Sequence, residues 1–551
     1  MSTAGAGIDD LAERFFELSC RRSPFGASSM GVAGFDHLVP DVSLEADDRF
    51  RGELAGLVAE AQAIDDTELN TTQSTTRLML IGQANDEIAS IDDRTIEYAA
   101  GTLDGPQARI LQSLPNSDAS TEEKADAYLT KLSSVVGFMD AATTRLRGGL
   151  LSGRSPVAQL IEASVEQLDT YLAMQDDPLL TPVRGQAVEG RAAKIVVNDI
   201  RPAMAALRET YSRVLLPEAR GNDLPGVCHL PQGERTYASA LRHHSTTDLT
   251  AEQIHQIGLE VVAALDDEYA SVGQRALGVS DPSLVRRQLR EDASLRFETR
   301  DQVLDVAVEA TARATAALPS VFGLLPTHDC DVLVTPDIEA PTSTLGYYRP
   351  PAGDGSRAGA YYINTWEPQT RTRYEAEALA FHEGVPGHHL QITISQAIEG
   401  LPKFRAFGYV TAHAEGWALY TERLADEMGL YSSEVSRLGM LSFDSWRACR
   451  LVVDTGIHAR GWSRDQAIDY LAENTALSMD NVRNEIDRYI AWPGQACAYM
   501  IGRREIVRLR AEAEVRLGAA FDLKSFHDRV LDQGAVPLDV LARTIEGWAL
   551  A

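Results

Sequence analysis

Apolar residues recur at helical spacing along most of the chain. Leu11, Phe15 and Leu18 form one stripe near the amino terminus, with the spacing that places side chains on one helix face. A longer stripe near the middle of the chain consists of Ile254, Ile257, Leu259, Val262 and Leu265. The pattern therefore predicts a mainly α-helical protein in which long helices are joined by short polar loops.

Two polar segments and one stretch of strand-like composition interrupt this helical pattern. Residues 148–156 are rich in Gly, Ser and Arg, and residues 215–233 hold three prolines, so both segments are expected to be loops. Near Asp331 the run DVLVTP is short and β-branched, and GAYYINTW follows from Gly359, which predicts two or more strands of a small sheet. We expect a helical region over residues 1–330 and a second region over residues 331–551, within one continuous fold.

Composition and charge narrow the class of protein. The chain has 551 residues, of which 44% are hydrophobic and 24% are charged, as in ordinary globular proteins. The net charge of −29 argues against nucleic acid or an anionic membrane as the partner, because both attract basic surfaces. The interpretation we favour is an acidic, solvated surface that aids solubility.

Cysteine usage and the amino terminus bear on the compartment. The five cysteines are far apart and odd in number, which predicts reduced thiols and no disulfide framework. The amino terminus carries Asp9, Asp10 and Glu13 where a secretory signal would have basic residues. No apolar run reaches the length of about 18 residues that a membrane span requires. We therefore expect a cytoplasmic protein.

The richest chemistry lies in FHEGVPGHHLQ, residues 381–391. Zinc hydrolases bind the metal through two histidines four residues apart, and the glutamate directly after the first histidine acts as the general base. Here Glu383 follows His382, but His388 is six residues after His382. On an unbroken helix the two imidazoles would point about 120° apart and lie about 9 Å apart along the axis. One regular helix could not bring both to one metal ion.

The residues between the histidines offer a solution to this mismatch. Pro386 has no amide hydrogen, and its ring collides with the carbonyl of His382 four residues earlier. The glycines at 384 and 387 allow backbone angles that other residues resist. We expect the helix to bulge over residues 384–387, which returns His382 and His388 to one face. His389 is the alternative ligand, although it needs a larger distortion.

A catalytic zinc ion needs a third protein ligand and leaves its fourth position to water. Our candidate is Glu415 in TAHAEGWALYTERL, because a loop near Leu401 allows a second helix to return beside the first. Glu422 shares the face of Glu415 and could be a second ligand, a partner of a ligand histidine or a surface charge. His413 points about 200° away from Glu415 on a helix, so both cannot face the metal.

The strand expected from Gly359 lies shortly before this motif. An exposed strand in that position can pair with an extended peptide and add it as one more strand. The other interpretation is an ordinary edge strand of a small sheet. Tyr361 and Asn364 are the candidate substrate-binding residues on this strand.

The sequence resembles a known family in three stretches. These are HEGVPGHHLQ, AEGWALYTE, and WPGQACAYMIGRREIVRLRAEAEVRLG with FHDRVLDQGAVPLDVL. They resemble the bacterial family catalogued as domain of unknown function 885, over most of the chain and most specifically from Gly359 onward. That family is similar to mostly helical zinc peptidases with a deep substrate channel, such as thermostable carboxypeptidases, thimet-type oligopeptidases and angiotensin-converting enzyme.

The resemblance implies roles for individual residues. His382, His388 and Glu415 would bind zinc and Glu383 would be the base, while residues 1–330 would form one wall of the channel. The inserted GVPG is a departure, because those peptidases keep the four-residue histidine spacing.

Stabilising the oxyanion requires a further donor. Related peptidases use a tyrosine or a histidine from later in the chain, and Tyr499 and His458 match that order. Each also has a structural interpretation: Tyr499 could be a core aromatic residue, and His458 could be a buried histidine without a catalytic role. Arg503 lies one helical turn beyond Tyr499 and could bind a peptide carboxylate, or could pair with one of the many acidic residues.

These features predict a zinc-dependent hydrolase, most simply a peptidase of the carboxypeptidase or oligopeptidase type that cleaves short peptides. Another divalent ion is the alternative to Zn²⁺. The alternative functions are a metal-dependent hydrolase of a specialised peptide-like metabolite and a non-catalytic peptide-binding protein. Exopeptidase and endopeptidase action both fit this prediction.

Overall fold

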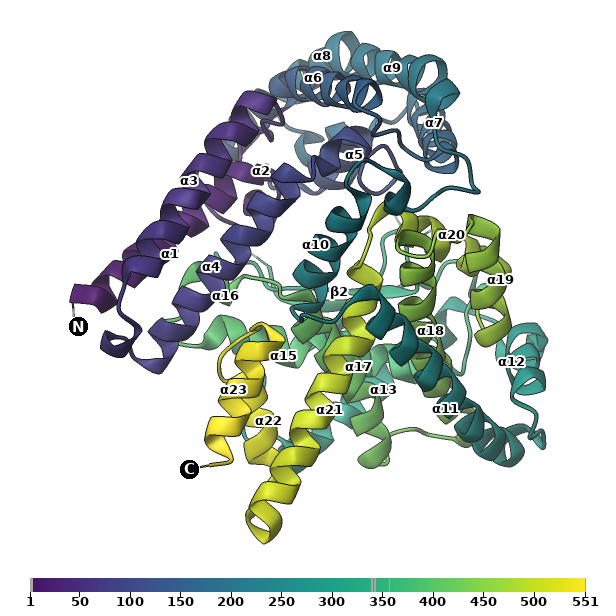
Figure 1. Cartoon of the computed structure of the whole chain (residues 1–551). Helices are drawn as coiled ribbons and strands as arrows, with labels where there is room; N and C mark the ends of the chain where they lie inside the picture. The colour runs from purple at the N-terminus through teal and green to yellow at the C-terminus, as the bar shows by residue number, and fades with distance from the viewer. Residues whose placement is uncertain (1–2, 338–339, 341–342, 356, 551) are drawn as a thin grey trace.

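The computed structural model describes residues 3–337, 340, 343–355 and 357–550. The chain is 70% helical with one small sheet, as Figure 1 shows, which confirms the mainly α-helical fold. The helices that precede the sheet are α1 Thr3–Arg22, α2 Pro24–Ser29, α3 Leu44–Ala63, α4 Thr71–Asp92, α5 Pro106–Ser113, α6 Glu122–Leu151, α7 Ala158–Ala173, α8 Glu189–Ile195, α9 Arg201–Thr210, α10 Gly233–Ser245, α11 Ala251–Leu277, α12 Pro282–Glu291 and α13 Arg300–Val321. The helices that follow it are α14 Ala376–Glu383, α15 His388–Ala397, α16 Lys403–Ala406, α17 Thr411–Glu427, α18 Glu434–His458, α19 Arg464–Asn474, α20 Met479–Ala491, α21 Ala498–Leu517, α22 Leu523–Leu531 and α23 Leu538–Trp548.

The sheet has three short strands, β1 Asp331–Val334, β2 Gly346–Arg349 and β3 Ala360–Ile363. Their order is β1-β3-β2, with β1 parallel and β2 antiparallel to the central β3. The backbone N–H of Tyr348 in β2 donates to Glu383 at the end of α14, with 2.9 Å between the two atoms. The predicted small sheet beside the metal motif is therefore confirmed.

Two local predictions differ from the structure. Leu259 is 38% exposed, because it lies five residues after the buried Ile254 and so about 140° around the helix from it. α6 extends to Leu151, so the first part of the expected loop at residues 148–156 is helical. Gly149 serves close packing there, since a Cβ atom would lie 2.2 Å from the carbonyl oxygen of Glu97.

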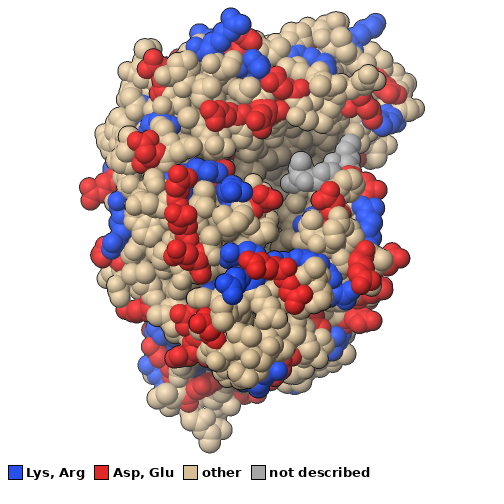
Figure 2. Space-filling view, turned by 90° about the vertical axis from the view of Figure 1, so that its right-hand side faces the viewer, with Lys and Arg blue, Asp and Glu red and all other residues tan. Residues whose placement is uncertain are grey.

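Two hydrophobic cores fill the molecule. The larger core draws residues from α1 through α23, on both sides of position 330. The buried residues of the smaller core run from Val42 to Leu215 and come mostly from α5 to α9, most of which lie together at the top of Figure 1. Figure 2 shows a face on which acidic and basic side chains are interspersed and the surface is hollowed near the middle.

All five cysteines are free thiols, as predicted. Among the described residues, no helix combines the length and the apolarity needed to cross a bilayer.

α18 is the central helix of the larger core, and it carries a fully buried carboxyl group. Asp454 accepts hydrogen bonds from the hydroxyl of Tyr237 at 2.6 Å and from the N–H of Gly494 at 3.0 Å. Burial nevertheless raises the pKa of Asp454 from 3.8 to about 7, because these hydrogen bonds only partly offset the loss of water.

Replacing Asp454 with asparagine is expected to alter how stability depends on pH. The folded-state pKa lies above the unfolded one, so Asp454 contributes stability that is complete below pH 4 and is lost as the pH rises towards 7. Relative to the variant, the wild type should lose about 2 kcal/mol of unfolding free energy between pH 5 and pH 7. Urea denaturation of both proteins across this range measures the difference, and parallel curves would contradict the assignment.

Candidate metal centre

The chain breaks between the two predicted ligand histidines. α14 ends at Glu383, α15 begins at His388, and Gly384 to Gly387 join them, with a cis peptide bond before Pro386. A Cβ atom on Gly387 would lie 1.9 Å from the carbonyl oxygen of His382, so only glycine fits there. The predicted interruption is confirmed, although it takes the form of two separate helices and not of a bulge in one.

His382, His388 and Glu415 meet in the interior. Their ligand atoms all lie within 4.8 Å of one another, and the three residues are 3%, 7% and 8% exposed. The Nε2 atoms of the two histidines each lie 3.5 Å from Oε2 of Glu415. In a tetrahedral site with bonds of about 2.1 Å, ligand atoms lie about 3.4 Å apart. The spacing therefore fits a zinc ion.

The hydrogen bonding also fits a metal. Oε2 of Glu415 is buried and has no hydrogen-bond partner among the described residues, although it faces both imidazoles. A buried carboxylate oxygen without a partner is costly, and a cation held by all three residues would satisfy it. Two neutral imidazoles and one carboxylate are a common ligand set for catalytic zinc.

Glu422 orients the first histidine. Its Oε1 lies 2.8 Å from Nδ1 of His382, and its side chain is completely buried. This contact leaves Nε2 of His382 to face the cluster, as a carboxylate partner does for metal-bound histidines. Burial lowers the pKa of His382, but the carboxylates of Glu415 and Glu422 outweigh it and raise the pKa to about 9. Of the three roles considered for Glu422, the structure supports the partner of a ligand histidine.

Replacing Glu422 with glutamine is therefore expected to weaken metal binding about 10- to 100-fold, because His382 loses its charged partner. Titration of the metal-free protein with zinc in the presence of a competing chelator measures this affinity. Glu427→Gln is the matched control, since Glu427 lies on the same helix but pairs with Arg510 at 2.9 Å. Equal zinc affinity of wild type and Glu422→Gln would contradict the role.

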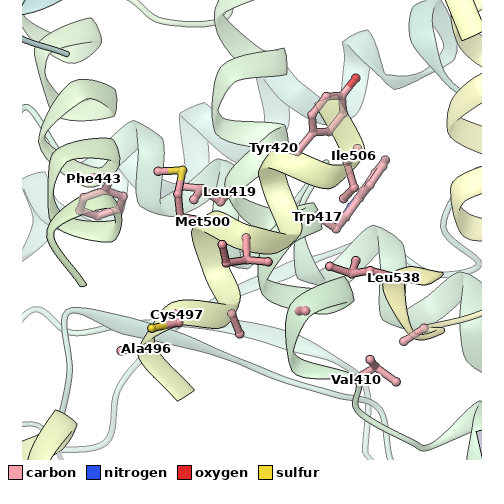
Figure 3. Packing of buried hydrophobic residues seen from close by; sticks show 14 of the residues in the cluster. Val410, Trp417, Leu419, Tyr420, Phe443, Ala496, Cys497, Met500, Ile506 and Leu538 are labelled. Atoms are coloured by element: carbon pink, nitrogen blue, oxygen red, sulfur yellow. The ribbon is translucent and has the colours of Figure 1, made fainter. Parts of the chain in front are cut away.

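Glu415 is positioned by close packing of two helices. α17, which carries Glu415, crosses α21 where Gly416 faces Gly502, and a Cβ atom on Gly416 would lie 2.5 Å from Cα of Gly502. Figure 3 shows Trp417, Leu419, Met500 and Ile506 packed around these two helices. The hydroxyl of Tyr409 donates to the second oxygen of Glu415, with 2.6 Å between the oxygens. No motif in the sequence pointed to Tyr409, because its role depends on the loop that precedes α17.

Glu383 lies beside the cluster and is partly exposed. Its Oε2 accepts the N–H of Tyr348, and its Oε1 accepts no hydrogen bond from any described residue. Burial raises the pKa of Glu383, while the neighbouring His382 and His388 oppose this shift. The carboxylate is thus held by one oxygen and has the other free for proton transfer.

Of the two oxyanion candidates, the structure brings only Tyr499 to the cluster. Its ring stacks on His382 with 6.5 Å between centroids, and its side chain is partly exposed. His458 is fully buried, with Nδ1 accepting the N–H of Val227 at 3.2 Å and Nε2 lying 2.9 Å from the carbonyl oxygen of Tyr489. Both nitrogens of His458 are used within the protein, so the structure corrects its assignment as an oxyanion donor.

The expected substrate-binding residues have other partners. Arg503 forms an ion pair with the buried Asp444, which is the structural alternative considered for it. The side-chain amide of Asn364 donates to the carbonyls of Ala340 and Thr344, so it organises a loop and is not free for a substrate. Tyr361 lies in the central strand and is 0% exposed, although its hydroxyl has no partner among the described residues. The predicted substrate-binding role of Arg503 and Asn364 is therefore wrong, because both side chains are bonded within the protein. Tyr361 is inaccessible to a substrate.

The two remaining histidines do not join the cluster. His389 contacts the hydroxyl of Tyr348 at 3.1 Å and the carbonyl oxygen of His328 at 2.8 Å. His413 contacts the backbone of Val536. These contacts use both ring nitrogens of His389, whereas Nε2 of His413 is buried and has no partner among the described residues.

Comparison with known proteins places the chain in a family. A family model described as "Bacterial protein of unknown function (DUF885)" matches residues 24–545. The chain belongs to this family. The DUF885 match confirms the family resemblance predicted from the three sequence stretches, and it assigns no activity. No curated protein matched the chain.

Two solved structures are similar to this DUF885 protein. A crystal structure of a candidate lipoprotein from Colwellia psychrerythraea is 26% identical, with a TM-score of 0.93 and a match covering 100% of both chains. A candidate lipoprotein of unknown function from Shewanella oneidensis is 18% identical, with a TM-score of 0.78, covering 98% of this chain and 99% of the other. The similarity to the Shewanella oneidensis structure, at 18% identity, shows only that the two proteins share a fold.

Proposed function

We propose that this protein is a zinc-dependent hydrolase that cleaves amide bonds of short peptides, of the carboxypeptidase or oligopeptidase type. The observation that carries the proposal is the buried cluster of His382, His388 and Glu415, with Glu383 directly beside it. The likeness to helical metallopeptidases is part of the same proposal. The low exposure of the three cluster residues, 3%, 7% and 8%, supports a recessed site that short substrates reach and folded proteins do not.

The residues suit hydrolysis in three ways. A divalent ion held by the cluster would polarise the substrate carbonyl and lower the pKa of a water molecule. Glu383 takes a proton from the attacking water through its free oxygen and passes it to the leaving amine nitrogen, so the amide becomes a carboxylic acid and an amine. The hydroxyl of Tyr499 is the donor for the developing oxyanion, because its ring lies against His382.

Metal analysis combined with peptide digestion tests the proposal. The purified protein should contain about one zinc per chain, a chelator should abolish cleavage, and added Zn²⁺ should restore it. In a library of dipeptides and tripeptides, several members should be cleaved. Cleavage of none by the zinc-loaded protein would favour the metabolite hydrolase or the binding protein, and cleavage unaffected by chelation would rule out the mechanism.

The location of the protein is part of the proposal. We propose the cytoplasm, whereas the two similar structures are described as candidate lipoproteins. Cell fractionation distinguishes a cytoplasmic protein from a lipid-anchored one, because a lipid-anchored protein would sediment with membranes.

A further inference from the structure

Arg447 is a buried cation without a partner. It lies in α18, is 4% exposed, and makes no hydrogen bond or ion pair with any described residue. Its Nε and Nη1 atoms are both buried and unsatisfied. The guanidinium lies 4.2 Å from the ring centroid of Phe443 and 4.4 Å from that of Trp446, so aromatic faces hold it in place.

Arg450 lies one helical turn further along α18, is 3% exposed, and shares the Trp446 ring at 4.4 Å. Its Nε donates to the hydroxyl of Tyr489 at 2.9 Å, and its Nη2 pairs with Glu485 at 3.2 Å. Its Nη1 is buried and has no partner among the described residues. The two guanidiniums therefore present three unsatisfied donor atoms beside the same tryptophan.

The charges in this cluster do not balance. Glu485 is shared with Arg488, whose Nη2 lies 2.8 Å from the same oxygen that pairs with Arg450. Two guanidiniums thus share the carboxylate of Glu485. Glu422 and Glu415 attract Arg447 electrostatically, but Glu422 is bonded to His382 and Glu415 faces both histidines of the candidate metal centre. Burying unpaired charge is costly, which indicates that an anion completes the cluster.

A single aromatic ring connects these arginines with the candidate metal centre. The Tyr499 ring stacks on His382 and lies 4.4 Å from the guanidinium carbon of Arg450 and 6.0 Å from that of Arg447. An anion bound by the arginine pair would therefore belong to the same molecule that reaches the metal. Planar guanidiniums bind carboxylates through paired hydrogen bonds.

We infer that Arg447 and Arg450 form the subsite that binds the α-carboxylate at the carboxyl terminus of the peptide substrate, beside the His382, His388 and Glu415 cluster. The inference rests on the proposed function and deepens it, because an enzyme with this subsite removes residues from the carboxyl end. It also transfers to this pair the carboxylate role first considered for Arg503.

Equilibrium binding to the metal-free protein tests the subsite without turnover. The probes are acetyl-Ala-Ala-Ala with a free carboxylate and the same peptide as its carboxyl-terminal amide, with calorimetry as the signal. Wild type should bind the free acid at least about tenfold more tightly than the amide, since a charged hydrogen-bond partner contributes about 1.5–3 kcal/mol.

Arg447→Met should remove this preference, Arg447→Lys should keep part of it, and Arg503→Gln should retain it. Acetyl-Ala-Glu-Ala-amide distinguishes an acidic side chain from the α-carboxylate, and tight binding of this amide would overturn the α-carboxylate assignment.

A thermal melt separates a ligand site from a structural role. Without ligand, Arg447→Met should have an unchanged or higher Tm, because it removes an unpaired buried charge. Equal binding of acid and amide by wild type, or a preference that survives in Arg447→Met, would overturn the inference. If the free acid binds as expected but the zinc-loaded protein cleaves no peptide, the subsite stands and the proposed function fails.

Discussion

Replacing Glu383 with glutamine is expected to lower kcat for peptide cleavage about 10³-fold, while the zinc content stays at the wild-type level. Glutamine keeps the size of the side chain and can still accept the N–H of Tyr348 through its amide oxygen. It cannot take up the proton of the attacking water, so the chemical step loses its base. Steady-state kinetics together with metal analysis of the same preparation measure both quantities.

Glu377→Gln is the matched control for this variant. Glu377 is a second glutamate of α14 and is buried, but its two oxygens accept from Arg313 at 2.7 Å and from the backbone of Ser432 at 2.9 Å. Its replacement should reduce stability without a comparable loss of kcat. Amide hydrolysis that survives in Glu383→Gln would contradict the proposed mechanism.

Replacing Gly502 with alanine is expected to reduce the unfolding free energy by at least about 3 kcal/mol and to weaken zinc binding. The added Cβ atom would lie 1.8 Å from the carbonyl oxygen of Ala412, which is backbone and cannot rotate away. α17 and α21 would have to separate, and Glu415 would move with α17 away from the two histidines. Chemical denaturation and zinc titration measure the two effects.

Gly137→Ala provides the comparison. Gly137 lies inside α6, and a Cβ atom there would meet no other atom within 4 Å. Alanine should therefore raise stability by about 0.5–1 kcal/mol through its better helix propensity. If Gly502→Ala were as stable as wild type and bound zinc equally well, the close crossing of the two helices would not be what positions Glu415.

The candidate metal cluster could be predicted because its sequence signal was local. His382, Glu383 and His388 lie within seven residues, and the physical properties of Pro386 and its flanking glycines indicated that the helix must be interrupted there. Glu415 required only one loop and a returning helix, which α17 provides. The strands at Asp331 and Gly359 could be recognised by composition, whereas β2 gave no separate signal.

The roles that were assigned wrongly depend on contacts between distant segments. His458 is matched in chain order to a catalytic histidine, but its nitrogens bind the backbone of residues 227 and 489. Arg503 faces the substrate side in a helical projection, yet Asp444 from another helix pairs with it. In the same way, nothing in the local sequence around Arg447 indicated that this arginine would be buried without a partner.

The sequence by itself determined that the chain is mainly helical, that the helix breaks between His382 and His388, and which residues form the candidate metal cluster. These properties follow from periodicity, from the missing amide of proline and from residue type, which act over a few positions. Only the tertiary structure decided that Glu422 holds His382 and that Gly416 and Gly502 let Glu415 approach. It also decided that Arg447 and Arg450 keep buried donor atoms near Tyr499 that have no partner among the described residues. The physical reason is that a side chain's partner and its burial are set by which distant segments pack against it, and spacing along one helix does not contain that information.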